Sequence, residues 1–297
     1  MTMRSILVAF IAMLIATHAH AALTVTDDTG AQVTLPGPAR RVVSLAPHVT
    51  ELLFAAGGGA RIVGTVSYSD YPKAAQSIPR VGDNKALDLE RIVALHPDLI
   101  VVWRHGNAAR QMDRLAALGI PLYYSEPTHL DDIAASIDKL GVLLGTEDTA
   151  RAASTAFTRD IAQLRAKYAR LAPVRVFYQV WDDPLMTLNR DNVFSEVIGV
   201  CGGVNVFAAQ TPRVPTISTE AVLAANPEAI VTATPGATKP DRALPALDRW
   251  KQWTSITAVA RGNLFGIDGD VINRPTPRIA IGAAELCRDL DIARGRR

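Results

Sequence analysis

The side chains able to do chemistry are few in this sequence, and their spacing matches none of the common catalytic motifs. The chain carries no GxGxxG, Walker, GxSxG, HExxH or CxxC pattern. Glycines 57–59 follow a helical run and lack a basic residue at phosphate-loop spacing, so they predict a helix end. No catalytic centre is indicated. We therefore expect a protein that is not an enzyme and that has no cofactor.

Histidine is a common metal ligand and the side chain whose charge most readily changes near neutral pH. His96, His105 and His129 share no ligand spacing, so we expect no dedicated metal site. His48 directly follows the first buried-strand pattern, at the start of a helix. Two interpretations of His48 stay open: a capping or solvent-facing residue, or a cleft residue that touches a ligand or even its metal.

Residues 1–21 form a secretory signal pattern. Arg4 precedes an apolar run from Ile6 to Ala16, and the small-residue ending predicts cleavage after Ala21. The run of about 11 residues is too short to span a bilayer. We therefore expect a soluble periplasmic protein.

The only cysteines, Cys201 and Cys287, form an even pair in an exported chain. A disulfide within the second half is the expected state, with two free buried thiols as the alternative.

Two glutamates occupy equivalent places in an internal repeat. DLERIVALHPDLIV (88–101) matches STEAVLAANPEAIV (218–231) at a constant offset, which aligns Glu90 with Glu220. Each glutamate stands early in a short helix, where a carboxylate stabilises the helix dipole. Two such charges on related lobes would also suit a two-fold partner with basic sockets.

The elements that position these residues alternate between strand and helix. Buried-strand patterns at 41–46, 61–66, 98–103 and 120–125 alternate with helical ones, and the same alternation resumes after residue 173. Between them, about 130–168 is helical throughout. We expect an α/β fold of two Rossmann-like lobes, at 22–145 and 173–297, joined by a long rigid α-helix within 146–172, with a ligand in the cleft.

Aromatic residues make up only 6% of the chain, so their positions are informative. Tyr68, Tyr71, Trp103 and Trp181 fall at or just after strand ends, where open α/β sheets bind ligands. Core packing explains any single one equally well, but together they suggest a cleft for a large, partly apolar ligand.

Composition excludes other classes. The chain has 297 residues, 48% of them hydrophobic, with 31 basic and 29 acidic residues. This balance is typical of a globular protein of about two domains. Without basic stripes interleaved with aromatics, nucleic acid is an unexpected partner.

Several segments resemble one family of proteins. They are RVVSLAPHVTELLFAAG, VSYSDYP, LDLERIVALHPDLIVVWRHGN, VCGGVNVF and RPTPRIAIGAAELC, and the similarity extends from about Arg41 to Cys287. The chain resembles the periplasmic cobalamin-binding proteins of vitamin B12 ABC importers. These belong to the helical-backbone (class III) substrate-binding proteins, which also carry siderophores, haem and metals.

The resemblance implies cobalamin, or a related corrinoid, bound between the lobes of a monomer as transported ligand. Tyr68, Trp103 and His48 would face the ligand, with the segment Asp270, Val271, Ile272, Asn273 and Arg274 on the second lobe. Trp181 is a further expected ligand-binding residue, from its place at a strand end rather than from the resemblance. The resemblance also implies that Glu90 and Glu220 engage arginines of a dimeric inner-membrane permease. Cys201 and Cys287 match the family's disulfide.

The chain departs from this branch in lacking tryptophans near Asn84 and Val214. This departure keeps open a second hypothesis, a receptor for a ferric siderophore or haem. The absence of a recognisable basic cluster in the cleft argues against it. A secreted enzyme of unrecognised type is the third hypothesis.

Overall fold

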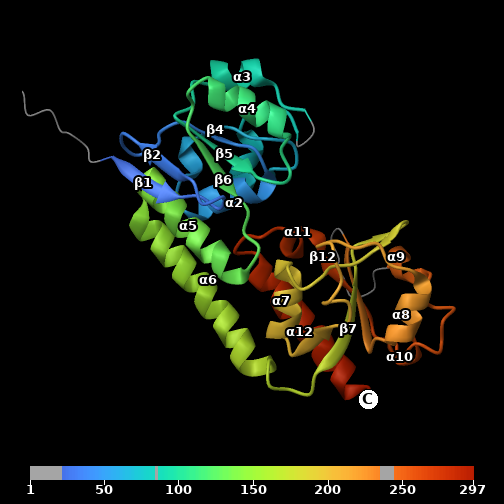
Figure 1. Ribbon diagram of the computed structural model, residues 1–297. Coiled ribbons are helices and arrows are strands. Elements are labelled where there is room, and N and C mark those ends of the chain that lie inside the picture. Colours follow the sequence, from blue (N-terminus) through green and yellow to red (C-terminus); the bar gives the residue numbers. More distant parts are fainter. Residues whose placement is uncertain (1–21, 84–85, 235–243) are drawn as a thin grey trace, which may run out of the picture.

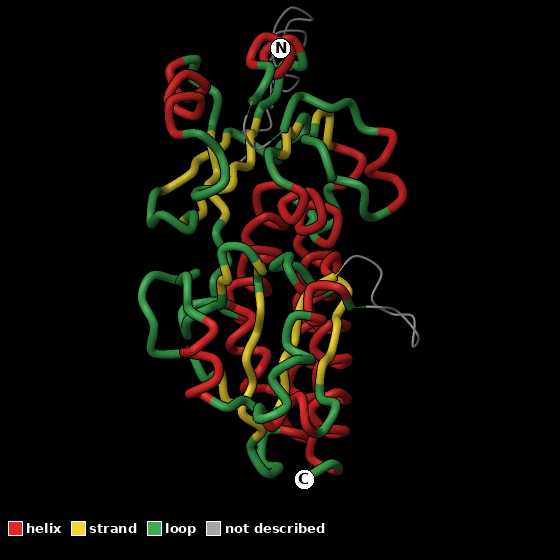
Figure 2. Tube along the Cα trace, turned by 90° about the vertical axis from the view of Figure 1, so that its right-hand side faces the viewer, coloured by secondary structure: helices red, strands yellow, loops and turns green. Residues whose placement is uncertain are grey.

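The computed structural model describes residues 22–83, 86–234 and 244–297, so the expected signal peptide lies outside the described residues. Two α/β lobes are arranged along a pair of long helices (Figure 1). Turned by 90°, the strands of the two sheets form separate groups, one above the other (Figure 2). No helix of the described residues is long and apolar enough to cross a membrane.

The N-terminal lobe contains a four-stranded parallel sheet. Its strands are β3 (Val42–Ser44), β4 (Ile62–Gly64), β5 (Leu99–Trp103) and β6 (Leu122–Ser125), in the order β4-β3-β5-β6. Its helices are α2 (Pro47–Ala55), α3 (Leu89–Ala94), α4 (Ala109–Ala117) and α5 (Leu130–Leu144), with 3-10 turns at Gly59–Arg61 and Lys73–Ser77. The antiparallel hairpin of β1 (Leu23–Thr26) and β2 (Gln32–Leu35) precedes the sheet.

The C-terminal lobe contains a second four-stranded parallel sheet. Its strands are β7 (Val174–Gln179), β10 (Gly203–Asn205), β11 (Ala229–Thr234) and β12 (Leu264–Asp268), in the order β10-β7-β11-β12. Its helices are α7 (Val193–Val200), α8 (Thr219–Ala225), α9 (Pro245–Asp248), α10 (Thr257–Ala260), α11 (Gly269–Ile272) and α12 (Ile279–Gly295). A two-stranded hairpin, β8 (Trp181–Asp182) and β9 (Leu185–Met186), follows β7.

The two sheets have the same topology. In each lobe the second strand along the chain lies at one edge, followed by the first, third and fourth. The repeat coincides with the helix before the third strand, α3 with β5 and α8 with β11. Even the backbone of the connecting turns agrees, since His96 and Asn226 are aligned by the repeat and both adopt a positive φ, 45° and 39°. The prediction of two related α/β lobes is confirmed.

Helix α6 (Glu147–Tyr168) lies along α5 and contacts α12 and α7 of the C-terminal lobe. One buried apolar cluster runs through this region. It includes Leu140 of the N-terminal lobe, Phe157 and Ile161 of α6, and Leu286 of the C-terminal lobe. The outer face of each sheet has a separate cluster. Hydrophobic burial therefore couples the lobes along the α5–α6 side of the molecule.

The two cysteines form the disulfide that was expected, with an S–S distance of 2.03 Å. Cys201 caps the C-terminus of α7 and Cys287 lies within α12. The bond therefore joins these two helices of the C-terminal lobe, in a region where both cysteines are fully buried.

Candidate functional site

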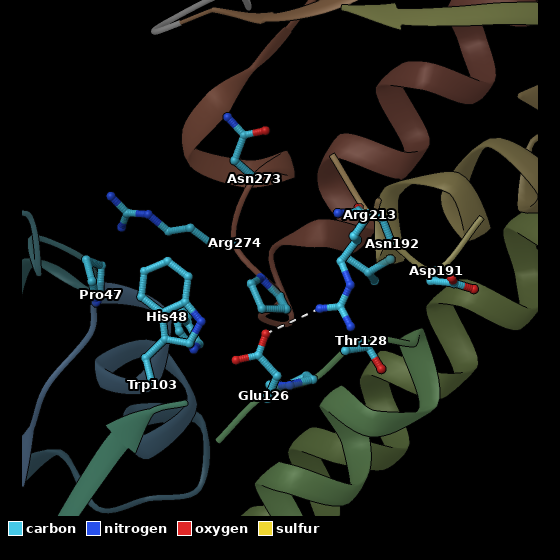
Figure 3. Close-up of a pocket in the computed structure, with 13 residues that line it drawn as sticks. Pro47, His48, Trp103, Glu126, Thr128, Asp191, Asn192, Arg213, Asn273 and Arg274 are labelled. Carbon is cyan, nitrogen blue, oxygen red and sulfur yellow. Dashed lines mark ion pairs between the residues drawn. The ribbon is translucent and has the colours of Figure 1, made fainter. Parts of the chain in front are cut away.

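A cavity of about 320 Å³ lies between the lobes, and both lobes line it (Figure 3). The N-terminal lobe contributes residues after the carboxyl ends of three parallel strands: Pro47 and His48 after β3, Trp103 at the end of β5, and Glu126, Pro127 and Thr128 after β6. The C-terminal lobe contributes Asp191, Asn192, Val193, Arg213, Asn273, Arg274 and Pro275. Strand carboxyl ends are where α/β sheets gather their ligands.

Trp103 is held in place by the turn that follows it. Its backbone N–H donates to Asn107 Oδ1 at 2.8 Å, and Asn107 Nδ2 donates to Leu45 O at 3.0 Å. The indole folds back over Gly106, where an added Cβ would lie 1.7 Å from the ring. Only glycine at this position permits the approach, so the sequence after β5 fixes the indole at the cavity wall.

His48 lies in the first turn of α2, and the residue is 5% exposed. The ring contacts the Trp103 indole edge-to-face, with centroids 5.4 Å apart. Its Nε2 is buried and has no hydrogen-bond partner within the described part of the chain. Helix α2 has no side-chain cap. Of the two interpretations of His48, the capping or solvent-facing one is therefore wrong, and His48 is a cavity-lining residue.

The charge state of His48 follows from its surroundings. Burial, and secondly the nearby Arg274 guanidinium, lower the pKa of His48 from 6.5 to about 3. Desolvation disfavours the imidazolium, and a positive neighbour adds to this effect. At neutral pH the imidazole is therefore neutral, and its buried Nε2 has no hydrogen-bond partner among the described residues. Such a nitrogen can accept or donate one hydrogen bond, or bind a metal carried by a ligand.

The segment 270–274 of the second lobe is divided in the structure. Asn273 and Arg274 line the cavity. Ile272 is 1% exposed and belongs to the apolar core, and Val271 packs against that core, so the structure does not bring them to the cavity. Asp270 is exposed and its Oδ1 lies 3.4 Å from Arg274 Nη2.

Tyr68 and Trp181 do not line this cavity. Tyr68 is 76% exposed, and its backbone carbonyl accepts a bond from Arg274 Nη2 at 3.3 Å. Tyr68 therefore lies beside the boundary between the lobes. Trp181 is 60% exposed in the β8–β9 hairpin, where its Nε1 donates to Asp183 O. Both rings remain open to solvent.

Arg213 and Glu126 are cavity residues that sequence reasoning missed. Arg213 Nη1 lies 3.5 Å from Glu126 Oε1, so this ion pair crosses the cleft, as the dashed line in Figure 3 shows. With Arg274, it gives the cavity two arginines. The sequence predicts Arg274 in the cleft but no basic cluster there. Arg213 adds a second cation to the lining, from a distant segment that only folding brings to the cavity. No sequence spacing relates the two arginines.

Glu90 and Glu220 lie far from the cavity, one on α3 and one on α8, and both are exposed. In Figure 1 these helices lie on separate lobes, away from α6. Their N-caps are equivalent: Asp88 accepts from Arg91 N and Ser218 accepts from Ala221 N. Hydrogen bonds from its own backbone N–H and from Ser218 hold the pKa of Glu220 below its usual range.

The protein has two lobes of the same topology and a cavity that both lobes line. The lining contains neutral and cationic hydrogen-bond donors. These features define a bilobed ligand-binding protein. Among the described residues, no group of three or more His, Cys, Asp or Glu is arranged to hold a metal ion. The chain belongs to the periplasmic binding protein family, whose profile matches residues 42–271.

Known relatives agree with this assignment. The vitamin B12-binding protein of Vibrio cholerae is 36% identical over 259 residues, which is 87% of this chain and 91% of the relative. The vitamin B12-binding protein of Yersinia pestis is 39% identical, covering 87% and 89%. The crystal structure of the V. cholerae protein matches with a TM-score of 0.79 over 87% of this chain and 99% of that chain. A periplasmic haem-binding protein of Pseudomonas aeruginosa, 26% identical, matches with a TM-score of 0.69 over 84% and 91%.

Proposed function

We propose that this protein captures cobalamin, or a closely related corrinoid, between its lobes and delivers it to an ABC permease of the inner membrane. The observation that carries the proposal is the interlobe cavity, in a chain that aligns over 87% of its length with relatives named vitamin B12-binding proteins. Residues 1–21 would direct export and be removed after Ala21, and sequencing the N-terminus of the periplasmic protein tests that cleavage.

The chemistry of the cavity fits a corrinoid. A corrin is a broad apolar macrocycle with amide side chains at its rim and a central metal. Trp103 supplies an aromatic surface, while Arg274, Asn273 and Asn192 supply side chains that hydrogen-bond amides. The cavity of about 320 Å³ is at the small end of the range of about 300–1,000 Å³ for ligand pockets. Part of the ligand would therefore lie outside it, against exposed rings such as Tyr68 and Trp181.

A second candidate, haem or a ferric siderophore, is favoured by one observation. Arg213, Arg274 and His48 line the cavity, and the buried Nε2 of His48 has no hydrogen-bond partner among the described residues. Two cations suit an anionic chelate, and an imidazole suits a haem iron. The lining also holds Glu126 and Asp191, and Glu126 pairs with Arg213, so the two cations give the cavity no net positive charge. Titration with cyanocobalamin in competition with haem and a ferric siderophore separates the two.

Calorimetric titration of the purified mature protein with cyanocobalamin tests the proposal. We expect one molecule bound per chain, and no displacement by equimolar haem or a ferric siderophore. Trp103→Ala should weaken binding at least about tenfold, because a buried aromatic anchor contributes at least about 1.4 kcal/mol. Trp253, which is 36% exposed and absent from the cavity lining, provides the matched control Trp253→Ala. Tight binding of haem with none of cyanocobalamin would replace the proposal by its alternative.

Delivery would use the two equivalent glutamates. Glu90 and Glu220 place one exposed carboxylate on each lobe, which fits a permease of two identical halves with basic residues at its surface. A monomeric binding protein would then present its cleft toward the centre of such a dimer.

A further inference from the structure

Glu51 forms a buried ionic contact between the lobes. It lies on α2 of the N-terminal lobe and is 4% exposed. Four donors reach its carboxylate, all from one short segment of the C-terminal lobe: Arg274 Nη1 at 2.9 Å, Thr276 Oγ1 at 2.9 Å, Arg278 Nε at 2.8 Å and Arg278 Nη2 at 2.5 Å. Charge-assisted bonds in a water-poor site are strong and well oriented.

Arg274 takes part in both this contact and the cavity. Its side chain extends from the second lobe toward the first, past His48 and Trp103 (Figure 3). Besides Glu51 it contacts Asp70 Oδ1 at 3.4 Å. The cavity lining includes Arg274 but not Glu51. Among the acceptors of Arg274, Glu51 is the nearest, at 2.9 Å, whereas the other three lie at 3.3–3.4 Å.

On the N-terminal lobe, helix α2 carries one residue of the cavity and one of the contact between the lobes. His48 and Glu51 are three residues apart on this helix, so they lie on neighbouring positions of one face. His48 lines the cavity, and Glu51 binds the other lobe. A shift of the C-terminal lobe against α2 would therefore move Arg274 relative to His48.

The ion pair between Glu126 and Arg213 also crosses the cleft but is more exposed. Glu126 and Arg213 are 3.5 Å apart in one ion pair, and the Arg213 side chain is 43% exposed. Arg274 and Arg278 are 16% and 14% exposed. Exposed single pairs contribute little, whereas a buried carboxylate without its partners is strongly unfavourable. Of these two ionic contacts the one at Glu51 is therefore the stronger, and it adds to the apolar packing along α5 and α6 in holding the lobes together.

We propose that Glu51 is a positioning residue, which holds Arg274 at the cavity wall and fixes the orientation of the two lobes, so that ligand affinity depends on it through Arg274. The effect on affinity rests on the proposed function, since it takes the cavity as the cobalamin site. The effect on lobe orientation does not.

A double-mutant cycle on cobalamin affinity tests the coupling. Glu51→Gln keeps the side-chain size but loses the charge and turns an amide group toward the arginines. We expect it to raise the Kd at least about tenfold in the wild-type background and less than about twofold in an Arg274→Met background, because coupled residues are non-additive. Equal effects in both backgrounds would overturn the proposal.

Glu228→Gln is the matched control, because it removes an equally connected carboxylate within one lobe. Glu228 accepts from Arg175 N at 3.0 Å and from Arg297 Nε at 3.1 Å, away from the cavity. It should lower stability without changing the Kd. If it raised the Kd as much as Glu51→Gln does, loss of a structural carboxylate would explain both, and the proposal would fail.

The second measurement needs no ligand. Spin labels carried by unnatural amino acids at Leu118 and Ile292, exposed positions on different lobes, report the interlobe distance. We expect a narrow distribution in the wild type and a broader one in Glu51→Gln. Arg278→Lys, which leaves Arg274 intact, should broaden it less and serves if Glu51→Gln does not fold.

An unchanged distance distribution in these variants would refute the positioning role. Broadening in a protein that binds no cobalamin would instead support the role of Glu51 and refute the proposed ligand.

Discussion

Replacing His48 should change how the stability of the protein depends on pH. The folded protein lowers the pKa of His48 from 6.5 to about 3. The unfolded chain therefore binds a proton below pH 6.5 that the folded state does not take up until about pH 3. Stability contributed by the neutral imidazole is complete above pH 6.5 and is lost as the pH falls toward 3.

The size of this effect follows from the shift. At about 1.4 kcal/mol for each pH unit, proton uptake by the unfolded state alone lowers the free energy of unfolding by about 2 kcal/mol between pH 7 and pH 5. His48→Gln removes the titration while keeping a polar side chain. Other groups contribute equally to both proteins, so the difference between them isolates His48.

Urea denaturation of the wild type and His48→Gln, at pH 7 and pH 5, measures this directly. The wild type should lose about 2 kcal/mol more than the variant between the two values. His96→Asn controls for the loss of one histidine, because His96 is exposed and its repeat equivalent is Asn226. If the wild type and His48→Gln lost the same free energy, the burial of a neutral imidazole would be refuted.

Two further predictions concern the disulfide and the equivalent glutamates. Replacing Cys201 and Cys287 by alanine opens a loop with a sequence separation of 86, so denaturation should show a loss of at most about 4.6 kcal/mol by the chain-entropy relation. An unchanged free energy of unfolding would show that the disulfide does not stabilise the protein by restricting the unfolded chain. Glu90→Arg with Glu220→Arg should abolish cobalamin uptake by cells yet leave the Kd unchanged, because both carboxylates lie outside the cavity. Equal loss of uptake and binding would contradict docking through these residues.

Much of the fold could be predicted because its signals are local. Strand and helix periodicity placed β3, β5 and α5, and the repeat around Glu90 and Glu220 predicted two related lobes. Two turns also depend on residues only a few positions away. They are the approach of the Trp103 indole to Gly106 and the end of α2 before glycines 57–59. The aromatic residues were less predictable, since Trp103 lines the cavity and Trp181 does not.

The sequence by itself determined the order of elements, the duplication and the pairing of two cysteines, because each depends on short-range pattern or on a single possible partner. Tertiary structure alone decided the burial of His48 and the contact of Glu51 with Arg274. Glu51 and Arg274 are 223 positions apart in the chain, and nothing in their local sequences relates them. Their chemistry arises from desolvation and from opposite charges meeting between two lobes, which exist only once both lobes have folded and packed together.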